Sequence, residues 1–186
     1  SFEKWALRLD SARRAALVRH DPWALGSPAV WFRHLPVDDR RAVVAAWLDI
    51  GHQHPRWGTP ILRALTEDRD LGTDATVDAV YARWSAAAQN QDGIIDIEQV
   101  RRLPENLALR EARRHLSTVT QLQTRPRQRL PYARFLGWDE AQATLKAYIG
   151  HPEGETRGHA LAILLALAGH TRDDAQRAAR VEEALR

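Results

Sequence analysis

The sequence contains no cysteine. Disulfide bonds, thiolate metal sites and a cysteine nucleophile are therefore excluded together. The absence also fits a reducing cytosol, and we expect a cytoplasmic protein. Lysine is nearly absent too. Lys4 and Lys146 are the two lysines of the sequence, and the other Lys/Arg positions are arginines. Together with the abundant alanine, this bias indicates a GC-rich genome before it indicates phosphate recognition.

No segment is apolar for long enough to cross a membrane. The longest apolar run covers residues 160–168, between His159 and Gly169, whereas a membrane span needs about 20 apolar residues. The N-terminal segment lacks the apolar core of a signal peptide. Charged side chains interrupt it at Glu3, Lys4, Arg8 and Asp10. We therefore expect no membrane contact.

No linker divides the 186 residues, which are enough for one domain with a core or for roughly four or five helical hairpins in a row. The chain begins at Ser1 without methionine and ends at Arg186 inside an unfinished amphipathic pattern. Removal of an initiator methionine and excision from a longer protein are the two explanations. We expect a single helical-repeat domain over residues 1–186, either complete or part of a longer array.

The C-terminal third has the pattern of stacked helices. Residues 138–149 carry one apolar stripe at helical spacing, and residues 150–154 form a tight stop rich in Gly and Pro. The apolar run at residues 160–168 is hydrophobic on every side, so neighbouring helices must enclose it. Residues 171–174 then open a third helix. This succession predicts an all-α protein, an α-solenoid of antiparallel helical hairpins.

The rest of the chain is also helical in pattern, because Val and Ile never alternate long enough to make a strand. We expect a first helix over residues 2–19, a helix that starts at Pro60, and another that starts at Thr73. Asp96 is expected to cap a short helix. The inward positions of the first helix are predicted at Trp5, Leu9, Ala12 and Ala16.

A further helix is predicted over residues 105–118, followed by a long irregular loop over residues 121–131. The inward side chains of this helix are predicted to be Leu109, Ala112 and Leu116. Its outward side chains are predicted to be Arg110, Arg113 and Arg114.

Two stretches resemble HEAT repeats. Residues 152–160, Pro-Glu-Gly-Glu-Thr-Arg-Gly-His-Ala, followed by Leu164, are similar to the second helix of a HEAT repeat, in which a Pro/Asp turn precedes an Arg and a leucine-rich helix of small residues. Residues 111–115 and 130–140 also resemble long HEAT-repeat proteins of actinomycete type. The resemblance covers mainly residues 111–186 and implies a HEAT-like solenoid whose second helices line a concave face. HEAT arrays serve as scaffolds, as binding surfaces and occasionally as enzymes, so the function stays open.

Seven tryptophans are many for this length. Trp5, Trp47 and Trp84 lie on apolar stripes and are predicted to pack in the core. Trp23 and Trp57 flank loops, where an exposed indole is a candidate for base stacking or a binding hot spot.

Two patterns resemble metal sites only superficially. Around Gly93 the chain is similar to the centre of an EF-hand loop, but Ala88 and Gln99 occupy the positions of the first carboxylate and the bidentate glutamate. A second group, His52, His54 and Asp49, has no further ligand near it in sequence. A simple turn and a solvated helix end are the preferred interpretations. We therefore expect no metal site and no cofactor.

The strongest electrostatic feature is the basic stretch at residues 101–134, with nine arginines against two glutamates. Its local charge is +7 in a chain of net charge +3, so the remaining residues sum to −4. Such a stretch binds phosphates or an acidic protein surface, or it is an ordinary solvated face. The candidate binding residues are Arg110, Arg113, Arg114, Arg125, Arg127 and Arg129.

Catalysis has little support in the sequence. No nucleophile elbow and no Gly-rich phosphate loop is present, so no catalytic residue is assigned. The first hypothesis is a non-enzymatic scaffold module that binds another protein. The alternative is a nucleic-acid-binding protein that uses the basic stretch. A HEAT-like DNA glycosylase is a remote third option, because no motif here carries that family's active site.

Overall fold

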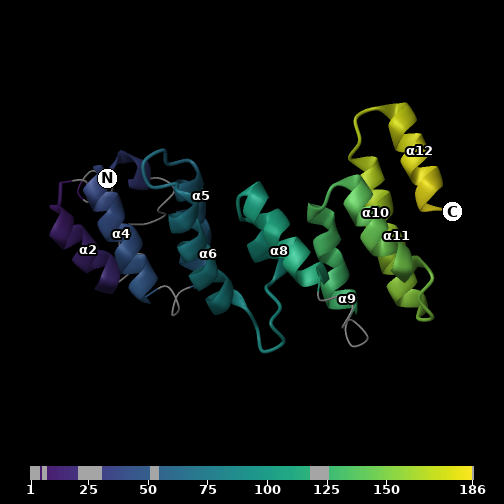
Figure 1. Ribbon diagram of the computed structural model, residues 1–186, viewed down its shortest axis with the longest axis horizontal. Helices are drawn as coiled ribbons and strands as arrows, with labels where there is room; N and C mark the ends of the chain where they lie inside the picture. Colours follow the sequence, from purple (N-terminus) through teal and green to yellow (C-terminus); the bar gives the residue numbers. More distant parts are fainter. Residues whose placement is uncertain (1–4, 6–7, 21–30, 51–54, 118–125, 186) are drawn as a thin grey trace. The chain divides into compact units, whose positions relative to one another are not determined.

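The computed structural model describes residues 5, 8–20, 31–50, 55–117 and 126–185 (Figure 1). Within these residues the chain is all-α, as predicted, and the only β pairing is an isolated bridge between Gln89 and Ile95. None of the described helices is long and apolar enough to cross a membrane. The chain divides into two compact units, Ser1–Pro104 and Glu105–Arg186.

The first unit consists of paired helices. Helix α2 packs along α4, and α5 packs along α6 (Figure 1). Its core contains fully buried aromatic and aliphatic side chains, among them Phe32, Trp47, Ile61, Leu65 and Trp84. The prediction that Trp47 and Trp84 are core residues is therefore confirmed. The described elements are α2 (Ser11–His20), η1 (Phe32–His34), α4 (Val37–Ile50), α5 (Pro55–Thr66), α6 (Asp74–Ala88) and α7 (Ile97–Arg101).

The helix predicted over residues 2–19 is interrupted, because Trp5 is helical but residues 8–10 form a turn and a bend before α2. Asp10 accepts a hydrogen bond from the backbone N–H of Arg13 at 2.8 Å, so α2 starts at Ser11. An aspartate at this position satisfies an N–H that has no partner within the helix, which favours a start there. Trp5 therefore lies outside α2 and is 49% exposed, and Ala12 and Ala16 are exposed as well. The inward face predicted for this helix is wrong at these three positions.

The start of α5 also differs from the prediction. The helix begins at Pro55, and Pro60 lies inside it rather than at its first position. A proline at a first position loses no helical hydrogen bond, and Pro55 fills that role here. The prediction for α6 is confirmed, because the Thr73 side chain accepts from the backbone N–H of Thr76 at 3.3 Å. Asp96 likewise caps α7 by accepting from the N–H of Glu98 at 2.7 Å.

The second unit begins with α8, and α8 and α10 follow the predicted bounds closely. The long loop predicted over residues 121–131 is wrong for its described part, because the chain is helical from Pro126 onward. Pro126 and Pro131 both stand at helix starts, where a missing N–H costs nothing. The described elements are α8 (Glu105–Ser117), α9 (Pro126–Arg129), η4 (Leu130–Phe135), α10 (Trp138–Ile149), α11 (Gly154–Gly169) and α12 (Asp174–Ala184).

Helix α11 is the centre of the second unit. It packs against α10, α12 and η4, which agrees with the expectation that neighbouring helices enclose this apolar segment. Ala160, Ile163, Leu164 and Ala168 point into these contacts and are buried. The enclosure is incomplete, however, because the opposite side of α11 remains open to solvent.

Candidate functional site

The fold pairs several arginines of the basic stretch with carboxylates. Arg113 on α8 donates from Nε and Nη2 to the two carboxylate oxygens of Glu140 on α10, both at 2.8 Å. These hydrogen bonds raise the pKa of Arg113 and lower the pKa of Glu140 from their ordinary values. Such a two-pronged arrangement fixes the orientation of both side chains, so this pair ties α8 to α10.

Arg127 on α9 is paired in the same way. Its guanidinium contacts the carboxylates of Glu153 and Glu155 at the start of α11. The hydroxyl of Thr156 donates to Glu153 at 2.7 Å, and this hydrogen bond together with Arg127 lowers the pKa of Glu153. A phosphate group would therefore have to displace two carboxylates from Arg127.

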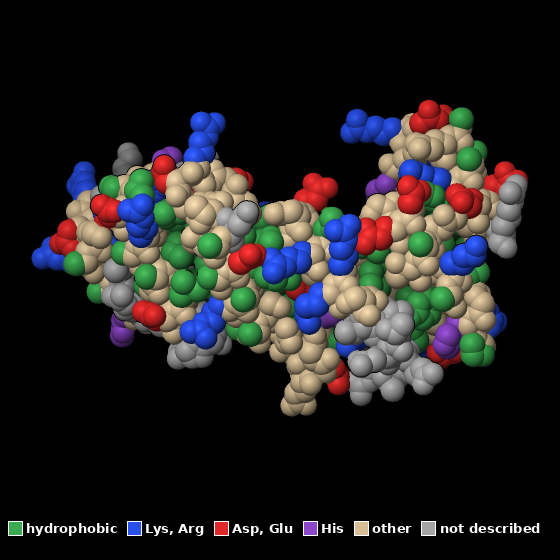
Figure 2. Space-filling model, in the orientation of Figure 1, with side chains coloured by type: hydrophobic (Ala, Val, Ile, Leu, Met, Phe, Trp, Pro, Cys, Tyr) green, Lys and Arg blue, Asp and Glu red, His purple; other side chains and the backbone are tan. Residues whose placement is uncertain are grey.

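The other candidate arginines lie in different surroundings. Arg114 and Arg129 reach a buried cluster on the inner side of α8, Arg110 is exposed on α8, and Arg125 lies outside the described residues. On the face shown in Figure 2, basic side chains over α8 and α10 lie beside acidic ones instead of forming an unbroken basic surface. The charge count over residues 101–134 did not reveal these ion pairs, because the acidic partners Glu140, Glu153 and Glu155 lie outside that stretch.

The buried cluster centres on Glu111 and His115, one turn apart on α8. Both side chains are 0% exposed, and His115 Nε2 lies 3.0 Å from Glu111 Oε1. Arg114 Nε donates to the same carboxylate oxygen at 2.7 Å. The imidazole stacks on the ring of Tyr132 from η4, with 4.1 Å between centroids and 30° between planes. The backbone oxygen of His115 accepts from Arg129 Nη1 at 3.4 Å.

Burial keeps the imidazole neutral. The loss of solvent around the ring lowers the pKa of His115, and the charges of Arg114 and Arg129 lower it further, against the opposing effect of Glu111. A neutral ring that carries its proton on Nε2 donates to Glu111, and Arg114 donates to the same carboxylate oxygen. The carboxylate is thus held by two donors in a site closed to water.

This cluster is a histidine–glutamate pair without access to a substrate. A general acid or base must come within hydrogen-bond distance of the proton that it transfers, and neither side chain reaches the surface. We interpret the cluster as a polar core that joins α8 to η4. The inward face predicted for this helix included Ala112 and Leu116 but not Glu111 and His115, because these two side chains are polar. The sequence feature that could have revealed the buried cluster is the helical spacing of five residues that are all buried: Ala108, Glu111, Ala112, His115 and Leu116.

A second candidate is the open side of α11, which we call the α11 face. It consists of the exposed Ala162 and Ala166 and the half-buried Leu161 and Leu165. These residues recur every three or four positions, so they share one side of the helix. Apolar surface left open on a helix that is apolar all round is a candidate for contact with another molecule.

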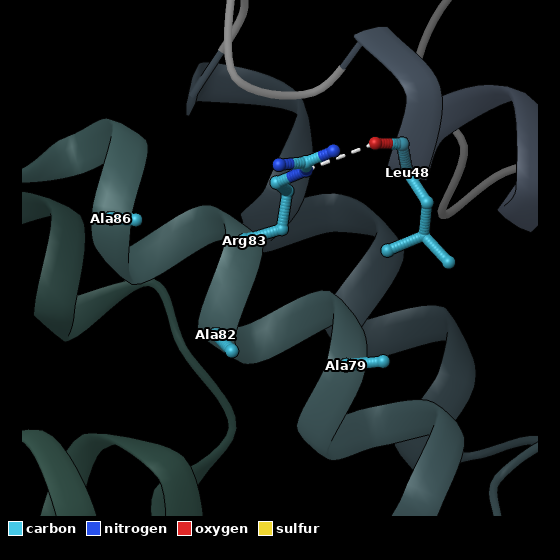
Figure 3. A pocket seen from close by; sticks show the side chains of 5 residues that line it. All are labelled: Leu48, Ala79, Ala82, Arg83 and Ala86. Carbon is cyan, nitrogen blue, oxygen red and sulfur yellow. Dashed lines mark hydrogen bonds between the residues drawn. The ribbon is translucent and has the colours of Figure 1, made fainter.

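A third candidate is a surface hollow of about 400 Å³ in the first unit, between the end of α4 and α6 (Figure 3). It is mainly apolar, and Arg83 Nε donates to the backbone oxygen of Leu48 at 3.0 Å. Arg83 is the one ionisable side chain among the described residues that line it. The lining residues are Leu48, Ala79, Ala82, Arg83 and Ala86.

The weaker sequence candidates do not form sites in the described structure. The Asn90 side chain accepts backbone N–H groups of Asp92 and Ile94, both at 2.9 Å, and Gly93 has a φ of 69°. This segment is therefore a turn in which glycine supplies the left-handed conformation. Among the described residues, no group of three potential ligands could hold a metal ion.

Several candidates of the sequence analysis cannot be compared with the structure. His52, His54 and Trp23 lie outside the described residues, and the side chain of Trp57 is not described either. Their predictions stay predictions. Asp49, expected beside the two histidines, is exposed near the end of α4.

No protein-family model, no curated protein and no solved structure matches this chain.

Proposed function

We propose that this chain is a non-enzymatic interaction module, an α-solenoid of antiparallel helical hairpins that binds another protein. The observation that carries the proposal is the α11 face. Two alanines and two leucines are presented on one side of a helix whose other sides are packed. Contact with a partner would remove this apolar surface from water, which is the main favourable contribution to most protein associations.

The state of the ionisable groups supports a binding role over a catalytic one. The fully buried His115 and Glu111 contact each other inside the second unit. Arg113 and Arg127, two of the cations assigned to nucleic-acid binding, serve as bridges between helices. Protein binding therefore needs no rearrangement of these side chains, whereas phosphate binding would break their ion pairs.

Substitution on the α11 face tests the proposal. Ala162→Glu places a charge at the centre of the face without removing any packed atom, because Ala162 is exposed. Ala147→Glu is the matched control, since Ala147 is exposed on α10 and both helices accept glutamate. Circular dichroism should show equal helix content in both variants. The wild-type chain, Ala162→Glu and Ala147→Glu are then used as baits in extracts of the source organism, with quantitative mass spectrometry.

We expect at least one protein to be retained by wild type and by Ala147→Glu and to be lost with Ala162→Glu. Its affinity, measured with the purified pair by calorimetry, should fall at least tenfold in Ala162→Glu. Equal recovery of every protein by the two variants would overturn the assignment of the α11 face. Turnover of a substrate by the purified chain would overturn the non-enzymatic function itself.

A further inference from the structure

The segment of α9 and η4, residues 126–135, packs against α8 mainly through η4, and we call this segment the clasp. Leu130, Tyr132 and Ala133 of the clasp are buried. We propose that His115 is an acid-sensitive latch, which holds the clasp on α8 while its ring is neutral and releases it when the ring is protonated. This inference does not depend on the proposed binding function.

Two contacts between α8 and the clasp involve His115. Its ring stacks on Tyr132, and its backbone oxygen accepts from Arg129. Because the ring itself is completely enclosed, no water can solvate a charge on it while the clasp is closed. A charge on this ring therefore acts directly on its stacking with Tyr132 of η4.

The groups around the ring determine the effect of a proton. Glu111 and Arg114 face it from α8, Arg129 from α9, and the uncharged Tyr132 from η4. The carboxylate of Glu111 is already compensated by Arg114. A protonated His115 would add a third cation to a site that holds one anion. In the open state the same imidazolium is hydrated, so protonation favours opening.

The sign and size of the effect follow from proton linkage. In the closed state the pKa of His115 is lowered, chiefly by burial, and in the open state it returns to its ordinary value of about 6.5. The open state thus binds more protons below about pH 6.5, and the closed state loses stability as the pH falls through that region. The opening equilibrium should rise by up to about tenfold for each pH unit below 6.5, until the closed form itself is protonated.

Hydrogen exchange of the full chain, read by mass spectrometry between pH 7.5 and 5.0 and corrected for the intrinsic rate, measures this opening. Peptides from residues 126–135 should lose protection by up to about fivefold between pH 6.5 and 5.5. Peptides from α10 serve as the internal reference, and their protection should change less. Loss of protection to the same extent in both segments, or in neither, would overturn the latch.

His115→Gln removes the titrating group but keeps a side chain that donates to Glu111. In this variant we expect clasp protection to be nearly independent of pH over the same range. His170→Gln is the matched control, because it removes an exposed histidine of the same unit and should leave the wild-type profile intact. An unchanged pH profile in His115→Gln would contradict the proposal.

The wild-type chain provides a measurement that does not require His115→Gln to fold. The imidazole carbon signals of His115, followed by NMR during a pH titration, should report a neutral ring as long as the clasp remains protected. If His115 becomes protonated near pH 6.5 while the clasp stays fully protected, the ring is not a latch.

Discussion

Gly58 on α5 lies directly against the indole ring of Trp84 on α6. A β-carbon at Gly58 would be 2.3 Å from Trp84 Cδ1 and 2.7 Å from Cγ, well inside van der Waals contact. Trp84 is completely buried and cannot swing away without displacing its neighbours. The absence of a side chain at Gly58 is therefore what allows α5 and α6 to pack at this distance.

Gly58→Ala should destabilise the first unit. Alanine favours a helix by about 1 kcal/mol relative to glycine, but overpacking a buried site typically costs about 1–3 kcal/mol or more. With a β-carbon only 2.3 Å from the ring, we expect the clash to dominate. The slowest-exchanging amides of α5 and α6 in the full chain would report the change in free energy of unfolding.

Gly158→Ala on α11 is the matched control for this prediction. A β-carbon there meets no atom within 4 Å, so only the helix preference remains. This variant should be more stable than wild type by about 0.5–1 kcal/mol. If Gly58→Ala stabilises the protein as Gly158→Ala does, the contact with Trp84 is not tight.

Asp39→Ala should strongly destabilise the pairing of α2 and α4. Arg14 on α2 is bonded to Asp39 on α4, and both side chains are almost fully buried. Removal of the carboxylate leaves a guanidinium in a site where burial already lowers its pKa. Loss of one partner of a buried pair typically costs about 3–5 kcal/mol.

The double variant Arg14→Met/Asp39→Ala tests the cause of that loss. It removes the buried guanidinium together with the carboxylate, so its free energy of unfolding should lie closer to wild type than that of Asp39→Ala. Urea unfolding followed by circular dichroism would compare the three proteins. A double variant at least as unstable as the single one would show that packing, and not charge, determines the loss.

The triple variant Arg113→Ala/Arg114→Ala/Arg127→Ala distinguishes the two functions of the basic stretch. These arginines bind Glu140, Glu111, Glu153 and Glu155, so we expect the variant to melt at a lower temperature and duplex DNA binding to change little. Fluorescent duplex and single-stranded oligonucleotides would be titrated at about 50 and 200 mM salt. Binding by wild type whose salt slope falls by roughly two to three units in the variant would instead support nucleic-acid recognition.

Local signals in the sequence were sufficient to predict where many helices begin and end, because helix ends depend on nearby residues. Thr73 and Asp96 cap the helices that follow them, and α10 begins at Trp138 as its apolar stripe predicted. Such caps and stripes act within a few positions. The burial predicted for Trp5 was wrong, because Asp10 caps α2 and the helical stripe that included Trp5 does not continue through residue 10.

The candidate site depended on contacts between distant segments, which a single sequence does not reveal. Arg113 and Glu140 are 27 positions apart, and their pairing became visible only in the fold. The buried pair Glu111–His115 was closer to prediction, since both residues lie on one side of α8. The sequence did not reveal that the ring of Tyr132 stacks on His115 and so covers that side of α8.

Arg180→Gln should loosen α12 from the rest of the second unit. The Arg180 guanidinium lies 5.1 Å from the centre of the Trp138 ring at the start of α10, within the range of a cation–π interaction. The same guanidinium donates from Nη1 to the Thr171 hydroxyl at 2.5 Å, so the variant loses both contacts, while α12 keeps its packing against α11. Contacts of this kind contribute about 0.5–1 kcal/mol at exposed sites, enough to raise amide exchange over residues 174–184 about two- to fivefold. Arg177→Gln is the control, because Arg177 forms its ion pair within α12, with Asp174. Equal exchange in the two variants would mean that Trp138 does not hold the helix through Arg180.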